Sequence, residues 1–394
     1  MFKDLKIIFG NIKGNMLRCI IGVVFVGVST FLMNVSLSRF MYQEYLNSLV
    51  RDCGLYKNYM YSAPPDKGVY YQNDNSTDLR ADALHYVQDN LMELEDEGKI
   101  EAFFSAASFN GPITDDIDER AYYLLYPKEF LCDIKFPTAM GEWFDKYDFN
   151  DNAIPVVIGC DLAAKYKIGC KYKFRGIDTE VRIIGVLDKN AMVLRCGAGG
   201  NGIDLNSVFR KGNDVIVACV DNMDFSNSSG ATIIKVSEQY QQNVLDCISD
   251  IVYTFSFKEL SDTAYENNRL ITEMQFVIFA LMMIVCITGV SSSNLLETIR
   301  CKKKYAVYFM CGMDWKRCIR ISFIESLFNL IIPTLIGYIA FLKWCEEQNF
   351  SALRITNTNV LVTTFFIIFV FVLTSLRPLI DIKNTSPVKI ISET

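Results

Sequence analysis

The stretch MQFVIFALMMIVCITGV, Met274–Val290, is a continuous apolar run without a charged residue. A helix rises about 1.5 Å per residue, so about 20 such residues cross the hydrocarbon core of a bilayer. Three further runs have comparable length and composition: Cys19–Leu37, Ile319–Leu342 and Val360–Leu376. Buried helices of a large soluble protein are the alternative, but they are usually shorter and seldom have basic flanks. We therefore predict a membrane protein with four α-helical transmembrane segments.

Basic residues flank these runs in a regular way. They are Lys3, Lys6, Lys13 and Arg18 before the first run, the KKK of residues 302–304 after the second, and Arg377, Lys383 and Lys389 after the fourth. The positive-inside rule assigns all of them to the cytoplasm. The first run is too long for a signal peptide and no small-residue cleavage motif follows it, which predicts a retained anchor. We expect a multi-pass protein of the cytoplasmic (plasma) membrane with both termini in the cytoplasm.

This topology divides the chain into segments. We predict a cytoplasmic amphipathic stretch at 1–18, transmembrane helices at 19–37, 274–293, 319–342 and 360–376, an extracytoplasmic domain at 38–273, a cytoplasmic coupling segment at 294–318, a short extracytoplasmic loop at 343–359 and a cytoplasmic tail at 377–394. The body of the outer domain is acidic and the rest of the chain is basic. The acidic surface favours solvation; attraction of cationic peptides is the weaker alternative.

The outer domain shows alternating helix and strand patterns. Leu79, Ala83, Val87, Leu91 and Leu94 recur at spacings of three and four, which predicts a helix over 78–95. A strand pattern follows at 100–109, and a second strand, helix and strand are predicted at 230–236, 237–250 and 251–257. We therefore expect an α+β domain with two β-α-β units within 38–150 and 222–273, and a β-rich insertion at 151–221.

One motif of the insertion matches a dinucleotide-binding pattern. Gly197, Gly199 and Gly202 give G-x-G-x-x-G after a strand-like run. Such a site needs a helix whose N-terminus faces the pyrophosphate, and the following residues are short and interrupted by Gly212. A flexible hairpin loop is the favoured interpretation.

Catalytic and metal-binding patterns are missing from the sequence. It contains no phosphate loop, no HExxH and no G-x-S-x-G, and His85 is its only histidine. We do not expect an enzyme or a metal site. The cysteines of the outer domain permit disulfides, but buried free thiols are the simpler expectation.

Three residues of the third apolar run are unusual for hydrocarbon. Glu325 and Asn329 lie four apart on one helix face, and Pro333 is expected to bend the helix. Pairing with a neighbouring helix is the favoured role of Glu325, and a substrate or proton role is the alternative. The other runs are nearly pure hydrocarbon, which favours helix motion over a wide aqueous pore.

The segment TIRCKKKYAVYFMCGMDWKRC, Thr298–Cys318, is both basic and aromatic. A basic run beside a membrane holds topology and meets anionic lipid, but this does not explain the apolar side chains. We predict a short amphipathic helix that ends at Gly312, with Asp314 capping the next helix. The residues expected to form its contact surface are Lys304, Tyr305, Tyr308, Phe309, Met310, Gly312 and Met313.

The order of one crossing, a large outer domain and three crossings resembles the FtsX-like permease family, and within it the MacB-type transporters. Three stretches carry the resemblance: Ile154–Asn190, Lys302–Leu327 and the tail SPVKII, Ser386–Ile391. In the second stretch, Gly312 and Glu325 match family positions. The chain departs from the family where Lys304, Tyr305 and Ala306 replace a Glu-Ile-Gly.

The resemblance implies a function as well as a layout. The β-α-β units would form a porter-like part, and the chain would be the permease subunit of an ABC transporter. It would work as a homo- or heterodimer with a second permease subunit in the lipid bilayer, bound to a separate cytoplasmic ATPase. ATP and Mg would be held by that ATPase, with no cofactor in this chain and no nucleic-acid partner. ATP hydrolysis would move the outer domain (mechanotransmission) for export or efflux of peptides, drugs or lipids. The alternative is a signalling protein that senses a ligand or activates an extracellular hydrolase.

Overall fold

The computed structural model describes residues 20, 22–63, 87–114, 119–149, 151–177, 179–196, 205–220, 229–249, 252–347 and 355–384. The chain forms two compact units. The helical unit consists of Met1–Tyr42 and Asn268–Thr394, and the sheet unit consists of Gln43–Asn267. Two helices contain the boundaries between them, α3 (Val28–Asp52) and α10 (Phe257–Met310).

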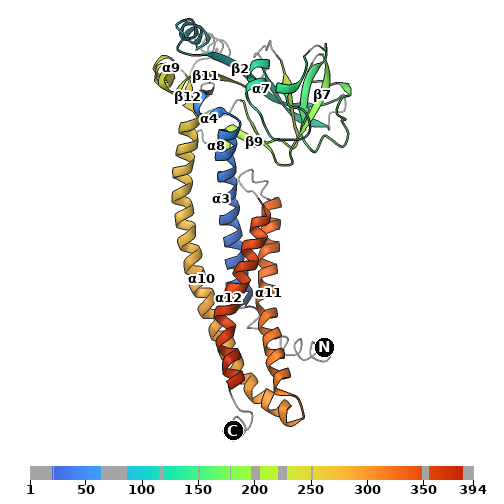
Figure 1. Cartoon of the computed structure of the whole chain (residues 1–394), viewed down its shortest axis with the longest axis vertical. Coiled ribbons are helices and arrows are strands. Elements are labelled where there is room, and N and C mark those ends of the chain that lie inside the picture. The colour runs from blue at the N-terminus through green and yellow to red at the C-terminus, as the bar shows by residue number, and fades with distance from the viewer. Residues whose placement is uncertain are drawn as a thin grey trace, which may run out of the picture. The chain divides into compact units, whose positions relative to one another are not determined.

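The helical unit contains long, apolar helices (Figure 1). They are the π-helix η1 (Val23–Gly27) with α3, then α10, α11 (Trp315–Glu347) and α12 (Asn357–Asn384). Within the described residues, four helices are long and apolar enough to cross a membrane, by length and composition. Together with the mixed α and β sheet unit, they confirm the predicted fold class.

Apolar side chains from all of these helices form one core. Its buried members are Val26, Met33, Cys286, Val290, Leu330, Phe366 and Val370. The backbones come closest at two glycines: a Cβ on Gly337 of α11 would lie 2.2 Å from the carbonyl oxygen of Gly27. Small residues at such contacts let membrane helices pack closely, because dispersion rather than water exclusion drives their association.

The sheet unit is built on one large sheet. Its strands are β1 (Tyr59–Ala63), β2 (Ala102–Pro112), β3 (Arg120–Tyr126), β4 (Thr138–Gly141), β5 (Ile154–Ile158), β6 (Lys171–Lys173), β7 (Glu180–Leu187), β10 (Val215–Cys219), β11 (Ser229–Lys235) and β12 (Tyr253–Ser256). Among the described residues, these ten strands follow the order β12-β1-β11-β2-β3-β10-β5-β7-β4, with β6 paired to β7. The short helices are α4 (Leu55–Asn58), α7 (Lys128–Asp133), η2 (Phe144–Lys146), α8 (Leu205–Val208), η4 (Glu238–Tyr240) and α9 (Gln241–Ile248).

The first four strands of this order contain the two predicted β-α-β units. β1, a helix at 87–96 and β2 form one unit, and β11, α9 and β12 form the other. The units interlock, because β11 lies between β1 and β2 and pairs antiparallel with both, while β12 pairs antiparallel with β1. This is the split β-α-β, ferredoxin-like arrangement. Both helices cover one face of the sheet, where Met60 and Ile234 pack against Leu91 and Val244.

The middle segment 151–221, the predicted β-rich insertion, contributes most of its strands to the large sheet. Its strands β5, β6, β7 and β10 extend the same sheet, because β2 pairs with β11 through Ala102–Ser108 and with β3 through Ala107–Pro112. β3 and β4, which precede residue 151, also belong to this half. Its core contains Tyr123, Val156, Ile183 and Ile216.

The glycine-rich motif connects two strands that form a separate hairpin. β8 (Met192–Leu194) pairs antiparallel with β9 (Phe209–Lys211), and the connecting residues 197–204 lie outside the described residues. The helix after them, α8, has only four residues. So short a helix offers no anion site, which agrees with the loop interpretation. The eleven cysteines whose side chains the structure describes are free thiols.

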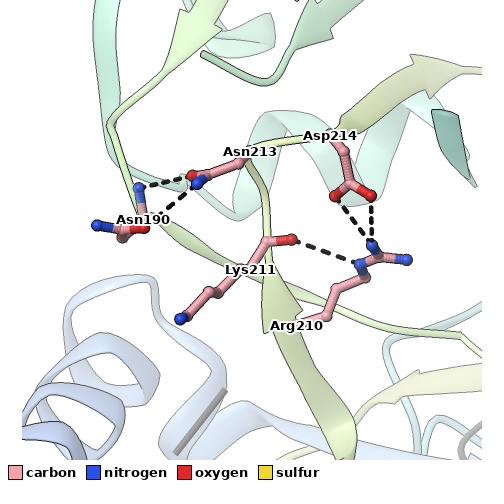
Figure 2. Close-up of polar contacts among 5 residues, drawn as sticks. All are labelled: Asn190, Arg210, Lys211, Asn213 and Asp214. Atoms are coloured by element: carbon pink, nitrogen blue, oxygen red, sulfur yellow. Dashed lines mark hydrogen bonds and ion pairs between the residues drawn. The ribbon is translucent and has the colours of Figure 1, made fainter. Parts of the chain in front are cut away.

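Polar contacts hold the base of this hairpin (Figure 2). The Asn190 backbone N–H donates to Asn213 Oδ1 at 2.8 Å, and Asn213 Nδ2 donates to Asn190 Oδ1 at 3.2 Å. Asn190 has a positive φ of 60°, which asparagine tolerates better than most residues. Arg210 Nη2 donates to both carboxylate oxygens of Asp214, at 2.9 and 3.1 Å. The Arg210 guanidinium also lies over the Tyr122 ring. These contacts fix the path of the chain between the end of β9 and the start of β10.

Candidate functional site

The candidate site lies at the end of α10, where the chain turns into α11. α10 is one helix of 54 residues that begins directly after β12 and ends at Met310. The predicted separate amphipathic helix over the basic segment is therefore wrong, since residues 294–310 continue α10. The physical reason is that no glycine or proline interrupts the chain between Gly289 and Gly312, and lysine and arginine are good helix formers.

α10 ends at Met310, and Gly312, the predicted helix-ending glycine, lies two residues later. Gly312 has φ of +91°, a left-handed conformation that glycine adopts without steric cost. The Gly312 N–H donates to the Phe309 carbonyl and the Met313 N–H donates to the Tyr308 carbonyl, both at 3.0 Å. This is the Schellman pattern, which satisfies carbonyls that the helix end leaves without partners.

The next helix begins with the predicted aspartate cap. Asp314 Oδ1 accepts a hydrogen bond from the Lys316 N–H at 3.3 Å, and the Asp314 carbonyl accepts from the Arg317 N–H at 2.9 Å. Gly312 and Asp314 thus close a tight connection between Met310 and Trp315. We term residues 304–318 the α10–α11 hairpin.

The hairpin has a small core of its own. Cys318 and Ile321 are buried, and Tyr308, Met313, Ile324 and Phe328 pack against them. The contact of Met313 with Tyr308 is the apolar contact that usually accompanies a Schellman turn. Tyr308 and Met313, both predicted as part of a contact surface, therefore serve first to hold the hairpin together.

Other predicted contact residues remain exposed. Phe309 is 39% exposed and Met310 is 64% exposed, and Val307 on the same turn is 53% exposed. Lys304 is exposed as well. The Tyr305 side chain lies outside the described residues. The hairpin thus presents an apolar tip next to the basic residues Lys304 and Lys316.

The intramembrane residues of α11 occupy distinct environments. Glu325 is 4% exposed, Asn329 is half-buried, and Pro333 lies inside α11, which continues as one helix to Glu347. A Cβ on Gly22 would lie 3.4 Å from Pro333 Cγ and 3.5 Å from the Asn329 carbonyl oxygen. This stretch of α11 therefore packs against the helix that precedes α3. A bend at Pro333 stays a prediction.

Sequence reasoning missed a second polar group in the helical unit. Asn34 and Ser38 of α3 form hydrogen bonds with Asn359 and Thr363 of α12. Asn294 Nδ2 donates to the Thr374 carbonyl at 3.3 Å. The first and fourth apolar runs thus contain side chains that form polar contacts between helices, Asn34 and Thr363. Asn34 within the first apolar run was the available signal, because an amide in hydrocarbon needs a partner.

Comparisons with known proteins give only weak likenesses. No family model matches the chain, and no curated protein matches it. The periplasmic region of MacB from Actinobacillus actinomycetemcomitans superposes with a TM-score of 0.32 and 11% identity, covering 57% of this chain and 97% of that chain. The extracellular domain of the ABC-type transporter YknZ from Gram-positive bacteria gives a TM-score of 0.30 and 9% identity, covering 50% of this chain and 100% of that chain. At these TM-scores the likenesses support no conclusion about function.

Proposed function

We propose that this chain is the permease subunit of an ABC transporter whose ATPase is a separate cytoplasmic protein. The observation that carries the proposal is the continuity of α10. This helix starts directly after Ser256, the last residue of β12, and ends at the α10–α11 hairpin. At 1.5 Å per residue its 54 residues extend over about 80 Å. The chain therefore passes from the sheet unit to the hairpin through one continuous helix.

The hairpin has the properties of a docking element. Tyr308 and Met313 fix its shape from within, while Phe309 and Met310 present apolar surface. Aromatic and methionine side chains are enriched at the centres of protein interfaces. An apolar groove on the ATPase would receive Phe309 and Met310, and acidic groups at its rim would face Lys304 and Lys316. ATP and Mg would be bound by that partner.

The mode of action that fits this arrangement is mechanical. Movement of the hairpin on ATP binding and hydrolysis would be transmitted along α10 to the sheet unit. The resemblance to MacB-type permeases adds a second permease subunit, with the termini and the hairpin in the cytoplasm and the sheet unit outside. Export of peptides, drugs or lipids is the proposed outcome.

Substitution of the exposed tip tests the proposal. Phe309→Asp places a charge where the ATPase groove would be, and Met310→Asp repeats the change one residue on. The loss of one buried aromatic anchor weakens binding at least about tenfold, so both variants should lose the co-purifying ATPase and its stimulated ATP turnover. Met92→Asp is the matched control, since Met92 is 52% exposed on the sheet-unit helix 87–96.

Three results would separate the possibilities. ATPase binding that is unchanged in Phe309→Asp and Met310→Asp would refute the hairpin as the docking element. Failure of the unmodified chain to bind any ABC ATPase would refute the permease function. ATP turnover that responds to peptides without moving them across vesicles would favour the signalling alternative.

A further inference from the structure

Four buried polar side chains join α3 to α12 inside the helical unit. Asn34, Ser38 and Asn359 are 0% exposed and Thr363 is 7% exposed. We term these residues the polar clamp. They lie outside the α10–α11 hairpin, the proposed docking element.

The clamp is a connected hydrogen-bond network. Asn34 Nδ2 donates to Thr363 Oγ1 at 3.0 Å, and Asn359 Nδ2 donates to Ser38 Oγ at 2.9 Å and to Asn34 Oδ1 at 3.3 Å. Asn34 Nδ2 also donates to the Thr30 carbonyl of its own helix at 2.9 Å. Both amide groups of the clamp thus bond across the helix interface.

Asn359 also organises the first turn of α12. Its Oδ1 accepts from the Thr356 N–H at 3.0 Å, and its own N–H donates to the Thr356 carbonyl at 3.0 Å. This reciprocal pattern resembles a capping box, which satisfies the first N–H groups of a helix. A single side chain therefore fixes the beginning of α12 and ties it to α3.

A second contact lies at Gly27, seven residues before Asn34 in the chain. A Cβ on Gly337 would meet the Gly27 carbonyl oxygen at 2.2 Å, so the two backbones touch there without side chains between them. Gly27 ends the π-helix η1, and the Val28 N–H bonds to the carbonyls of both Val24 and Phe25. Short π-helical segments such as η1 are frequent at functional sites in helices.

From these two contacts we infer that α3 pivots at Gly27 and Gly337, and that the polar clamp is a reversible latch that holds α3 against α12. Hydrogen bonds between membrane helices are individually weak. Asn359 is the third residue of α12, so it lies at the margin of the apolar span Asn357–Thr374, where water replaces broken bonds. α3 continues to Asp52, and its residues from Gln43 onward belong to the sheet unit. The inference concerns contacts among η1, α3, α11 and α12 and does not depend on an ATPase.

Thiol labelling of the full chain in lipid nanodiscs tests the latch. In a Ser38→Cys background the new thiol is buried, so N-ethylmaleimide should modify it slowly. Adding Asn359→Ala or Thr363→Val should raise that rate about tenfold, the effect expected from losing two interhelical bonds of average strength. The matched controls are Asn357→Ala and Thr364→Val. Asn357 is exposed, and Thr364 Oγ1 bonds only its own helix, at the Val360 carbonyl, among the bonds the structure records.

Cys286 supplies an internal standard for each sample. It is fully buried in the core of the same helical unit, and peptide mass spectrometry follows it separately from residue 38. Faster labelling at residue 38 with Cys286 still protected supports the latch. Equal rates at residue 38 in clamp and control variants would overturn it. Parallel exposure of residue 38 and Cys286 would also overturn it, because the clamp would then be ordinary structural support.

Discussion

Gly27 and Gly337 touch through their backbones: a Cβ on Gly337 would lie 2.2 Å from the Gly27 carbonyl oxygen. No side-chain rearrangement relieves such a contact, because both partners are helix backbone. Gly337→Ala should therefore force α11 away from η1 and destabilise the helical unit by about 1–3 kcal/mol, the usual range for overpacking. Thermal unfolding in nanodiscs measures the effect.

Gly289→Ala is the matched control for that substitution. A Cβ at residue 289 would meet the Phe25 ring at 3.2 Å, and a ring edge yields more easily than a carbonyl oxygen. Its destabilisation should be the smaller of the two. Equal effects of the two alanines would contradict the assignment of Gly337 as a backbone contact.

The turn at Gly312 yields a second prediction. Alanine in the left-handed conformation costs about 1–2 kcal/mol relative to the right-handed one, so Gly312→Ala should loosen the α10–α11 hairpin. Cys318 reports on this, since it is 0% exposed beneath Tyr308 and Met313. Its labelling by N-ethylmaleimide should become at least about fivefold faster.

Gly312→Asn tests whether the backbone conformation of residue 312 causes the loosening of the hairpin. It tolerates the left-handed region better than alanine, so Gly312→Asn should leave Cys318 closer to its original protection. If alanine and asparagine loosened the hairpin alike, the conformation of residue 312 would not be the reason.

The local parts of this fold could be predicted from the sequence, and the long-range parts could not. The three-and-four spacing of Val87, Leu91 and Leu94 identified a helix whose members are indeed buried, because that period depends only on neighbouring residues. The pairing of β2 with both β11 and β3 produces no comparable pattern in the sequence. The β2–β11 pairing joins segments more than 100 residues apart, so the sequence pattern alone does not show that strands of 151–221 continue the same sheet.

In the candidate site, too, local features could be predicted from the sequence and long-range contacts could not. Gly312 and Asp314 end and begin helices through their own backbone conformation and side chain, so their roles could be predicted. Residues 294–310 continue α10 instead of forming a short helix, because the charges of Lys302–Lys304 do not end a helix. Asn34 was overlooked because its partners, Asn359 and Thr363, lie more than 300 residues away. Only the folded chain brings them together.

The paired asparagines at the hairpin base of the sheet unit give a third prediction. Asn213→Ala removes two hydrogen bonds to Asn190, and partly exposed bonds of this kind contribute about 0.5–1.5 kcal/mol each. Unfolding followed by the fluorescence of Trp143, which is buried in this unit, should show a loss of about 1–2 kcal/mol. Asn190→Gly keeps the positive φ and the backbone N–H donor, and should cost less. A larger loss in Asn190→Gly would mean that the Asn190 side chain dominates.

The fourth prediction concerns acid stability of the sheet unit. Asp133 Oδ2 accepts hydrogen bonds from Lys235 Nζ and, at 2.9 Å, from the Tyr59 hydroxyl. The bond from Lys235 lowers the pKa of Asp133 below its ordinary value of 3.8, and the bond from Tyr59 adds to this, against the opposing effect of burial. A carboxylate with a lowered folded pKa stabilises the fold above its unfolded pKa and loses that contribution as the pH falls through the folded pKa.

The sheet unit should therefore lose stability as the pH falls below about 4, and Asp133→Asn should reduce that loss. Because Asp133 is partly exposed, solvent screening keeps its contribution small. Trp143 fluorescence during urea unfolding between pH 3 and pH 7 measures it. Asp96→Asn is the control, since it removes an exposed carboxylate from helix 87–96 without touching Lys235 or Tyr59. If Asp133→Asn and Asp96→Asn flattened the pH profile equally, net charge rather than the Lys235–Asp133–Tyr59 contacts would be its cause.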